Sequence, residues 1–331
     1  MRRLGAQGPA VCPLALGCAA MSPGYGGTTD EAESLATIHA AIDAGAGARR
    51  VLIDTANFYG QGHNELLIAK AIRERREEVV LSVKAGALRG PDGAFLGIDN
   101  RPAAIRNFIG YSLTRLGVDV IDLYRPARLD PQVPIEDTVG AIAELVDQGY
   151  VRHIGLSEMG AETVRRAHAV HPIADLQIEY SLMSRGPEDA ILPVLDELGI
   201  GVTAYGVLCH GLLSDSARPA DAAGGARAHL PRFRPNNFER NRALVAAVTA
   251  IAREKGVTTA QLAIAWVLAR GPRIVPVIGA RGRGQLDEAL GALAITLDAA
   301  DRARIEQAMP AEAVAGSRYA EPLMRMLDSE P

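Results

Sequence analysis

The chain has 331 residues, of which 48% are hydrophobic and 22% charged, so it carries enough apolar material for a large core. Its 35 basic and 39 acidic residues give a formal net charge of -4, which provides no electrostatic footprint for nucleic acid or for an anionic membrane. The three cysteines lack the close spacing of a zinc or redox motif, so we expect no metal site and a reducing, cytoplasmic location.

No stretch approaches the roughly 18 apolar residues that a membrane helix needs, so no membrane span is expected. The apolar run that follows Arg2 and Arg3 is interrupted by Pro13, which argues against an export signal.

Short runs rich in Val, Ile and Leu recur along the chain and alternate with helical patterns. These runs predict strands at 12–17, 49–55, 78–85, 119–124, 151–157, 174–180, 199–205 and 273–279. Apolar residues at three- and four-residue spacing predict helices at 31–45, 101–117, 135–149, 160–170, 187–198 and 240–269. Eight strands alternating with helices, without a linker, predict a single α/β domain over residues 1–331, a closed (β/α)8 TIM barrel rather than an open doubly wound sheet.

Two segments stand out from this alternation. Residues 213–241 form a long connection after the seventh predicted strand, and they are rich in Gly, Ala, Pro and Arg. Loops of this length in compact domains are usually functional or disordered, and this one would open on the catalytic face of a barrel, so we expect a lid. The run RERREE at 73–78 mixes both charges and is expected to be a solvated helix end.

Polar residues stand at the ends of predicted strands, where a barrel places its active site. Asp54 ends the second strand, Tyr59 follows it in DTANFYGQGHNE, and Lys84 ends the third. A phenol titrates near ~10, and an ammonium held by a carboxylate would stabilise its phenolate, so the trio suits proton transfer to a carbonyl oxygen. Each residue alone has a structural explanation, as a cap, a packing aromatic or an ion-pair partner, so the prediction rests on their combination.

The segment DTANFYGQGHNE resembles the signature of the aldo-keto reductases. The resemblance continues in chain order through Lys84, LSE at 156–158, Gln177, AYGVLCHGLL at 204–213 and VPVIGARGRGQLDEALGA at 275–292. It implies a (β/α)8 barrel that transfers hydride reversibly between NADP(H) and an aldehyde or ketone. It also implies Tyr59 as the general acid, Lys84 as the group that lowers its pKa, and Asp54 as the partner of the lysine.

The resemblance also implies a site for NADPH or NADP+. Ser157 and Gln177 would contact the nicotinamide carboxamide and Tyr205 would stack on the ring, although a buried amide or a packing aromatic would explain Gln177 or Tyr205 equally. Arg281 would bind the 2'-phosphate, because its guanidinium donates two hydrogen bonds and supplies charge. Arg283 could share that role or be a solvated helix residue. The residues that the resemblance assigns to the cofactor are Gly17, Ser157, Gln177, Tyr205, Leu208, Gly279, Arg281 and Gln285.

Three positions depart from the family pattern. The corresponding segment of the family usually reads DLYxxHRxDP, so Ala127 stands where the fourth catalytic residue, a histidine, is found. Glu158 stands where an asparagine commonly follows the serine, and Ala289 replaces an asparagine that often contacts adenine. We expect simple aldehydes to be poor substrates, unless Arg125, Arg128 or a water already reaches the carbonyl oxygen.

The leading hypothesis is therefore an NADPH-dependent carbonyl reductase whose partner is a small carbonyl compound, with an oligomer left open. PARLDP at 126–131 and residues 155–182 are similar to the pyridoxal reductase branch, which makes a polar ring substrate the leading expectation. One alternative is a cofactor-binding regulatory subunit of the same fold with little turnover. A more remote alternative is an unrelated barrel lyase that forms a Schiff base on Lys84.

Overall fold

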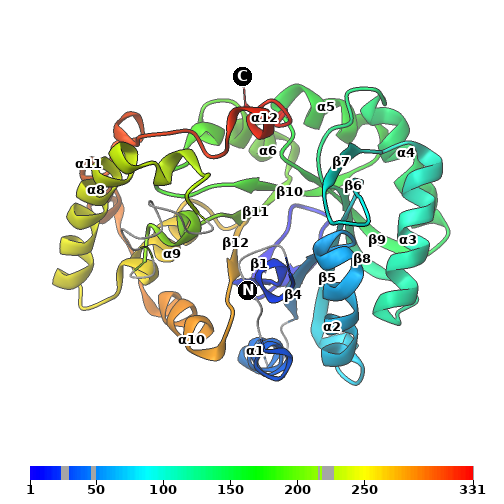
Figure 1. Ribbon diagram of the computed structural model, residues 1–331, viewed down its shortest axis with the longest axis horizontal. Coiled ribbons are helices and arrows are strands. Elements are labelled where there is room, and N and C mark those ends of the chain that lie inside the picture. The colour runs from blue at the N-terminus through cyan, green and yellow to red at the C-terminus, as the bar shows by residue number, and fades with distance from the viewer. Residues whose placement is uncertain (24–29, 46–49, 215–216, 218–226, 331) are drawn as a thin grey trace.

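Eight parallel strands close into a barrel that is surrounded by helices (Figure 1). The computed structural model describes residues 1–23, 30–45, 50–214, 217 and 227–330. In order around the barrel, the strands are β3 (Ala15–Gly17), β4 (Val51–Ala56), β5 (Val79–Ala85), β8 (Ile121–Pro126), β9 (Val151–Ser157), β10 (Ile173–Glu179), β11 (Gly201–Tyr205) and β12 (Ile274–Gly279). All eight predicted strands are present, so the (β/α)8 prediction is confirmed.

The interior of the barrel changes character from one end to the other. Near the N-terminal ends of the strands it is filled by a buried apolar cluster that includes Leu52, Val80 and Leu123. Because side chains of a strand alternate between its faces, residues two positions further along point into the same interior. Asp54 follows Leu52 and Arg125 follows Leu123 in this way, so the polar interior lies toward the C-terminal ends.

A two-stranded hairpin closes the N-terminal end of the barrel. Strand β1 (Arg2–Arg3) pairs antiparallel with β2 (Ala10–Val11), and the intervening Leu4 is buried in the interior cluster. The guanidinium of Arg2 donates to the carbonyl oxygens of Leu268 and Ile274, at 2.6 Å each. The predictions contained no such hairpin, since two-residue strands carry no periodic signal.

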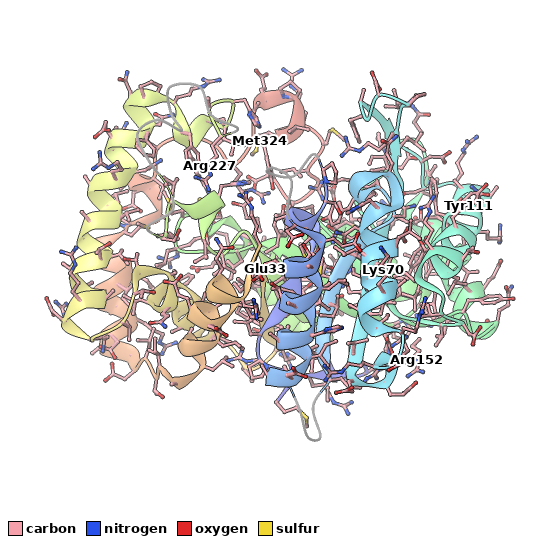
Figure 2. The ribbon with its side chains drawn as sticks, turned by 60° about the horizontal axis from the view of Figure 1, so that its bottom comes forward. Glu33, Lys70, Tyr111, Arg152, Arg227 and Met324 are labelled. Atoms are coloured by element: carbon pink, nitrogen blue, oxygen red, sulfur yellow. The ribbon has the colours of Figure 1, made fainter. Side chains whose placement is uncertain are left out.

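The α-helices in the described part of the chain are α1 (Glu31–Ala44), α2 (His63–Ile72), α3 (Pro102–Leu116), α4 (Ile135–Asp147), α5 (Ala161–Val170), α6 (Ile191–Leu198), α8 (Pro235–Glu254), α9 (Thr259–Ala269), α10 (Arg283–Gly291), α11 (Ala299–Ala308) and α12 (Glu321–Met324). Charged side chains such as Lys70 on α2 and Arg152 on β9 lie on the outer surface (Figure 2). No described helix combines the length and the apolar character that crossing a membrane requires.

The prediction of one continuous helix over 240–269 is wrong. Helix α8 ends at Glu254, and Gly256 then takes a left-handed conformation with φ of +69°. Helix α9 restarts after Thr258, whose hydroxyl and the Gln261 side chain form a capping box. A left-handed glycine ends a helix and a capping box begins one, so the sequence GVTTAQ marks the break.

The expectation for RERREE was also incomplete, because one of its residues reaches into the protein. Helix α2 ends at Ile72, and Arg76 forms an ion pair of 2.7 Å with Asp122, which is almost fully buried at the start of β8. Arg50 binds the same carboxylate at 2.7 Å. This run therefore stabilises the N-terminal end of the barrel.

Part of the expected lid, residues 215–216 and 218–226, lies outside the described residues. The described remainder includes a 3-10 turn, Pro231–Phe233, and the start of α8 at Pro235. Phe233 and Phe238 are buried against each other, with ring centres 5.9 Å apart. This part of the segment is packed into the protein, and its role as a lid stays a prediction.

Candidate active site

A buried ion pair between neighbouring strands is the centre of the polar interior. Strands β4 and β5 pair with Ala56 opposite Lys84, which places Asp54 and Lys84 side by side. The Lys84 ammonium lies 2.5 Å from Asp54 Oδ2, and both residues are only 5% exposed. The other carboxylate oxygen accepts hydrogen bonds from Ser82 Oγ at 2.8 Å and from Gln177 Nε2 at 2.9 Å. The carboxylate is thus held by three side chains from two other strands, β5 and β10.

The charges in this site shift the pKa values of both partners. Burial would raise the pKa of Asp54, but the charges of Lys84 and Arg125 and the hydrogen bonds from Lys84 and Gln177 hold it below its usual value. Burial lowers the pKa of Lys84, and the Arg125 charge adds to this effect, while Asp54 opposes it. Asp54 therefore stays ionised to a lower pH than a free aspartate, and the Lys84 ammonium loses its proton more easily than that of a free lysine.

Tyr59 stands on a tight turn directly after β4. The turn Tyr59–Gly62 contains left-handed residues at Gly60 and Gln61, with φ of +54° and +53°. The Gln61 amide donates to the Gly90 carbonyl at 2.8 Å, which ties the turn to the hairpin of β6 (Ala87–Arg89) and β7 (Phe95–Ile98). The Lys84 Nζ lies 5.1 Å from the centre of the Tyr59 ring. The predicted trio of acid, amine and phenol is therefore assembled.

Asn64 is a buried clamp on this turn that the sequence analysis missed. Its Oδ1 accepts from the Thr55 hydroxyl at 2.6 Å, and its Nδ2 donates to the Cys18 carbonyl and the Ser22 hydroxyl at 2.8 Å each. The asparagine thus joins β4 to the segment after β3. The only sequence signal for this role was that Asn64 lies within the segment DTANFYGQGHNE.

Ala127 lies directly after β8, with its amide donating to the Ala85 carbonyl at 2.8 Å. The Arg125 side chain points into the barrel and is fully buried, so it is not the group that reaches a carbonyl oxygen above the trio. Arg128 lies nearer the site, donating to the Ala127 carbonyl at 2.6 Å and to Ser157 Oγ at 3.4 Å. Its charge also acts on the Tyr59 phenol, and among the described residues no carboxylate lies within 4 Å of it.

The glutamate at the position of the family asparagine anchors the C-terminal segment. Glu158 is fully buried and left-handed, with φ of +52°. Its carboxylate accepts two hydrogen bonds from Arg318, at 3.0 and 2.8 Å, and others from Ser329 Oγ at 2.5 Å and Tyr205 Oη at 2.7 Å. Burial would raise the pKa of Glu158, but the Arg318 hydrogen bonds and charge lower it to about 2. We call the residues around this contact, 315–330, the C-terminal strap.

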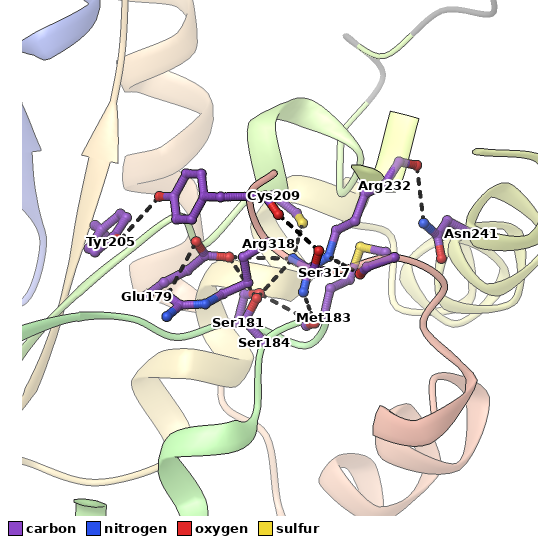
Figure 3. Close-up of polar contacts among 12 residues, drawn as sticks. Glu179, Ser181, Met183, Ser184, Tyr205, Cys209, Arg232, Asn241, Ser317 and Arg318 are labelled. Carbon is purple, nitrogen blue, oxygen red and sulfur yellow. Dashed lines mark hydrogen bonds and ion pairs between the residues drawn. The ribbon is translucent and has the colours of Figure 1, made fainter. Parts of the chain in front are cut away.

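A second carboxylate joins the strap to the described part of the long loop (Figure 3). Glu179, at the end of β10, accepts from Ser184 Oγ at 2.6 Å. Arg232 from the loop and Arg318 from the strap approach it at 3.3 and 3.5 Å. The strap and the loop therefore meet over the ends of β10 and β11.

The residues assigned to the cofactor fall into three groups. Ser157 and Gln177 are paired neighbours on β9 and β10, beside the Asp54 carboxylate. Gly17 and Gly279 are paired neighbours on β3 and β12. The remaining assigned residues follow β11 and β12, namely Tyr205 at the end of β11, Leu208 beyond it, and Arg281 and Gln285 after β12.

The segment expected to bind the 2'-phosphate contains two arginines, and one of them forms an ion pair within the protein. Arg283 forms an ion pair of 3.0 Å with Glu33 on α1, and its amide donates to the same carboxylate at 2.8 Å. The Arg281 amide donates to the Gln285 side chain at 2.8 Å, while its guanidinium forms no ion pair with any residue in the described ranges. Arg281 is therefore the available cation. Throughout the described chain, no group of three or more His, Cys, Asp or Glu side chains is arranged to hold a metal ion.

Comparison with known proteins agrees with this geometry. The model of the Aldo/keto reductase family matches residues 13–310. A probable aldo-keto reductase 1 of Glycine max is 39% identical over 322 residues, which are 96% of this chain and 91% of that protein. The structure of a glycerol dehydrogenase from Gluconobacter oxydans superposes with a TM-score of 0.82 at 29% identity, covering 100% of this chain and 97% of the other.

An aldo-keto reductase from Klebsiella pneumoniae, solved in complex with NADPH, superposes with a TM-score of 0.73 at 26% identity, covering 94% of this chain and 96% of the other. Fold and site thus define an oxidoreductase of the TIM-barrel type. The chain belongs to the aldo-keto reductase family.

Proposed function

We propose that this protein is an NADPH-dependent reductase of aldehydes or ketones, with Tyr59 as the general acid. The observation that carries the proposal is the buried Asp54–Lys84 pair with the Tyr59 ring 5.1 Å from the lysine Nζ. The Tyr59 phenol gives its proton to the carbonyl oxygen as negative charge develops there. The Lys84 ammonium stabilises the phenolate left behind, and Asp54 keeps that ammonium charged and in place.

The residues of this chain fit NADPH, which supplies the hydride when it is bound. The Gln177 side-chain amide donates a hydrogen bond to Asp54 at 2.9 Å, and its carbonyl oxygen remains available to accept one from the nicotinamide carboxamide. Ser157 is its neighbour on β9 and supplies a hydroxyl to the same group. Arg281 offers a guanidinium to the 2'-phosphate. A Klebsiella pneumoniae relative in complex with NADPH supports the choice of cofactor.

We infer a polar substrate because the donor that the family histidine would supply is missing at Ala127. A substrate with its own hydroxyl or ring nitrogen beside the carbonyl would recover part of the lost stabilisation, and Arg128 adds a cation at this side of the site. Pyridoxal belongs to this class and is the first compound to assay, together with a plain aldehyde of similar size.

The test is NADPH oxidation against a panel of carbonyl compounds by the wild type, Tyr59→Phe and Tyr150→Phe. Tyr59→Phe should lower turnover by about 10²–10⁴-fold, the scale of general acid catalysis, while NADPH affinity changes little. Tyr150, exposed at the opposite end of the barrel, is the matched control and should leave turnover unchanged. Wild-type turnover by Tyr59→Phe, with the chemical step rate-limiting, would require another acid. NADPH binding without turnover on any carbonyl would favour the regulatory subunit.

A further inference from the structure

A second buried ion pair lies beneath the Asp54–Lys84 pair. Arg125 on β8 and Asp175 on β10 are both 0% exposed, and the Arg125 Nη2 approaches Asp175 Oδ1 at 3.2 Å. The Thr203 hydroxyl on β11 donates to Asp175 Oδ2 at 2.6 Å and accepts from Arg125 Nη1 at 3.0 Å. Three strands, β8, β10 and β11, thus contribute to a charged network inside the barrel.

This network is costly to bury, and its hydrogen bonding is incomplete. The Arg125 Nε and Asp175 Oδ1 make no hydrogen bond, although both are buried. The pair also requires a glycine beside it, because a Cβ on Gly155 would lie 2.5 Å from Asp175 Oδ1 and 3.1 Å from Arg125 Nε. Apolar residues of similar volume often replace such a pair without loss of stability, so stability alone does not account for it.

The network is connected to the catalytic groups by hydrogen bonds. Arg125 Nη2 donates to Ser82 Oγ at 3.2 Å, and Ser82 Oγ donates to Asp54 Oδ1 at 2.8 Å. The other oxygen of Asp54 holds Lys84 at 2.5 Å. Because a hydroxyl has one proton, the Arg125 donor obliges Ser82 to direct its own proton at Asp54.

We propose that Arg125, held by Asp175, is a positioning residue for the reaction: it orients Ser82 and Asp54 and places a permanent cation beneath Lys84. The inference rests on the proposed function, since it concerns the same proton transfer. In a chain without the family histidine, this cation adds stabilisation of the negative charge that develops on the phenol and the carbonyl oxygen. It acts through the catalytic groups and does not touch the substrate.

The expected consequence is electrostatic and depends on every charge around the lysine. The titratable and charged groups around Lys84 and its partner Asp54 come from four neighbouring parts of the barrel. They are Cys18 after β3, Tyr59 after β4, Arg125 on β8 with Arg128 after it, and Asp175 on β10. Arg125 helps to lower the pKa of both Lys84 and Asp54. Removing it should therefore move the deprotonation of Lys84, and with it the loss of reductase activity at high pH, to a higher pH.

The test uses the double variant Arg125→Gln/Asp175→Asn, which removes both charges but keeps polar side chains. Its matched control, Arg50→Gln/Asp122→Asn, removes an ion pair between the partly exposed Arg50 and the buried Asp122, at the opposite end of β8. The conservative Arg125→Lys keeps the charge and loses the second donor arm, so it separates charge from orientation. For each variant, kcat and KM with NADPH and the best carbonyl substrate are measured across pH, with thermal unfolding as a check of folding.

We expect the double variant to lose about tenfold in kcat with KM within about twofold, and its high-pH limb to rise by up to about one pH unit. Loss of the Arg125 charge alone, at a distance of ~10 Å, has an effect of about one pH unit at an effective dielectric constant of about 20, and loss of the Asp175 charge offsets part of it. The control should keep the wild-type profile. Arg125→Lys should keep the wild-type limb and lose turnover severalfold.

A folded double variant with wild-type kcat and pH profile would overturn the proposal, as would an equal shift in the control. If the double variant does not fold, Arg125→Lys decides, and wild-type kcat there would refute the orienting role. Absence of turnover in the wild type would count against the proposed function instead. In that case the tyrosinate absorbance of Tyr59, measured as the difference from Tyr59→Phe, tests without catalysis whether loss of the Arg125 cation moves the ionisation of this phenol to a higher pH.

Discussion

The contact between Glu158 and Arg318 should make the stability of this protein depend on pH in a specific way. The perturbation is Glu158→Gln, which keeps the shape of the side chain, removes its charge and turns an amide donor toward the Arg318 guanidinium. Glu158 is fully buried and accepts both hydrogen bonds of the Arg318 fork, at 3.0 and 2.8 Å. The strap should therefore be held less tightly in the variant.

The magnitude follows from the pKa of the folded protein. The Glu158 pKa falls from 4.5 to about 2 on folding. At ~1.36 kcal/mol for each pKa unit, the ionised carboxylate contributes about 3 kcal/mol to the free energy of unfolding. Because the folded pKa is depressed, this contribution is complete above pH 4.5 and is lost as the pH falls toward 2. About half of it should remain near pH 3.

The assay is urea unfolding of the wild type and of Glu158→Gln at a series of pH values between 7 and 3. The difference between their free energies of unfolding should be about 3 kcal/mol at pH 7 and should shrink to about half at pH 3. Glu197→Gln, at an exposed ion pair with Arg165, should differ little from the wild type at any pH because solvent screens it. A difference for Glu158→Gln that stays constant across this range would refute the reasoning.

Three further substitutions test other parts of the site. Arg281→Ala should weaken NADPH binding by about tenfold or more, the value of one charge-assisted phosphate contact, and leave NADH binding nearly unchanged in a fluorescence titration; equal losses would contradict the assignment. Ala127→His should raise kcat/KM for a plain aldehyde relative to pyridoxal by restoring part of a donor worth about 2.7–4 kcal/mol, whereas a uniform loss on both would show that the pocket is built around the alanine. Gly155→Ala should lower the free energy of unfolding by about 1–3 kcal/mol, because its Cβ would lie 2.5 Å from Asp175 Oδ1, and an unchanged urea midpoint would argue against that crowding.

The sequence by itself determined the barrel and the central trio. Buried parallel strands need apolar runs such as VLIDTA at 51–56 and VVLSVKA at 79–85. These runs are local patterns that can be recognised in the sequence without knowing the tertiary contacts. Polar residues near the C-terminal end of such a run lie at the catalytic end of a barrel strand, so Asp54 and Lys84 could be placed without a structure. The break between α8 and α9 also has a local sequence signal, namely Gly256 and the capping box at Thr258, which the sequence analysis did not use.

Only the tertiary structure decided how the polar groups around that trio are satisfied. Glu158 and Arg318 are 160 residues apart in the sequence, and Arg125 on β8 meets Asp175 on β10 inside the barrel, with β9 between their strands. No local pattern predicts such partners. The counter-ion of a buried charge depends on which side chains lie beside it once the barrel has closed and the strap has packed. The sequence showed that a histidine was missing at position 127, whereas the structure showed that Arg125 is sealed beneath the site and that Arg128 lies beside it.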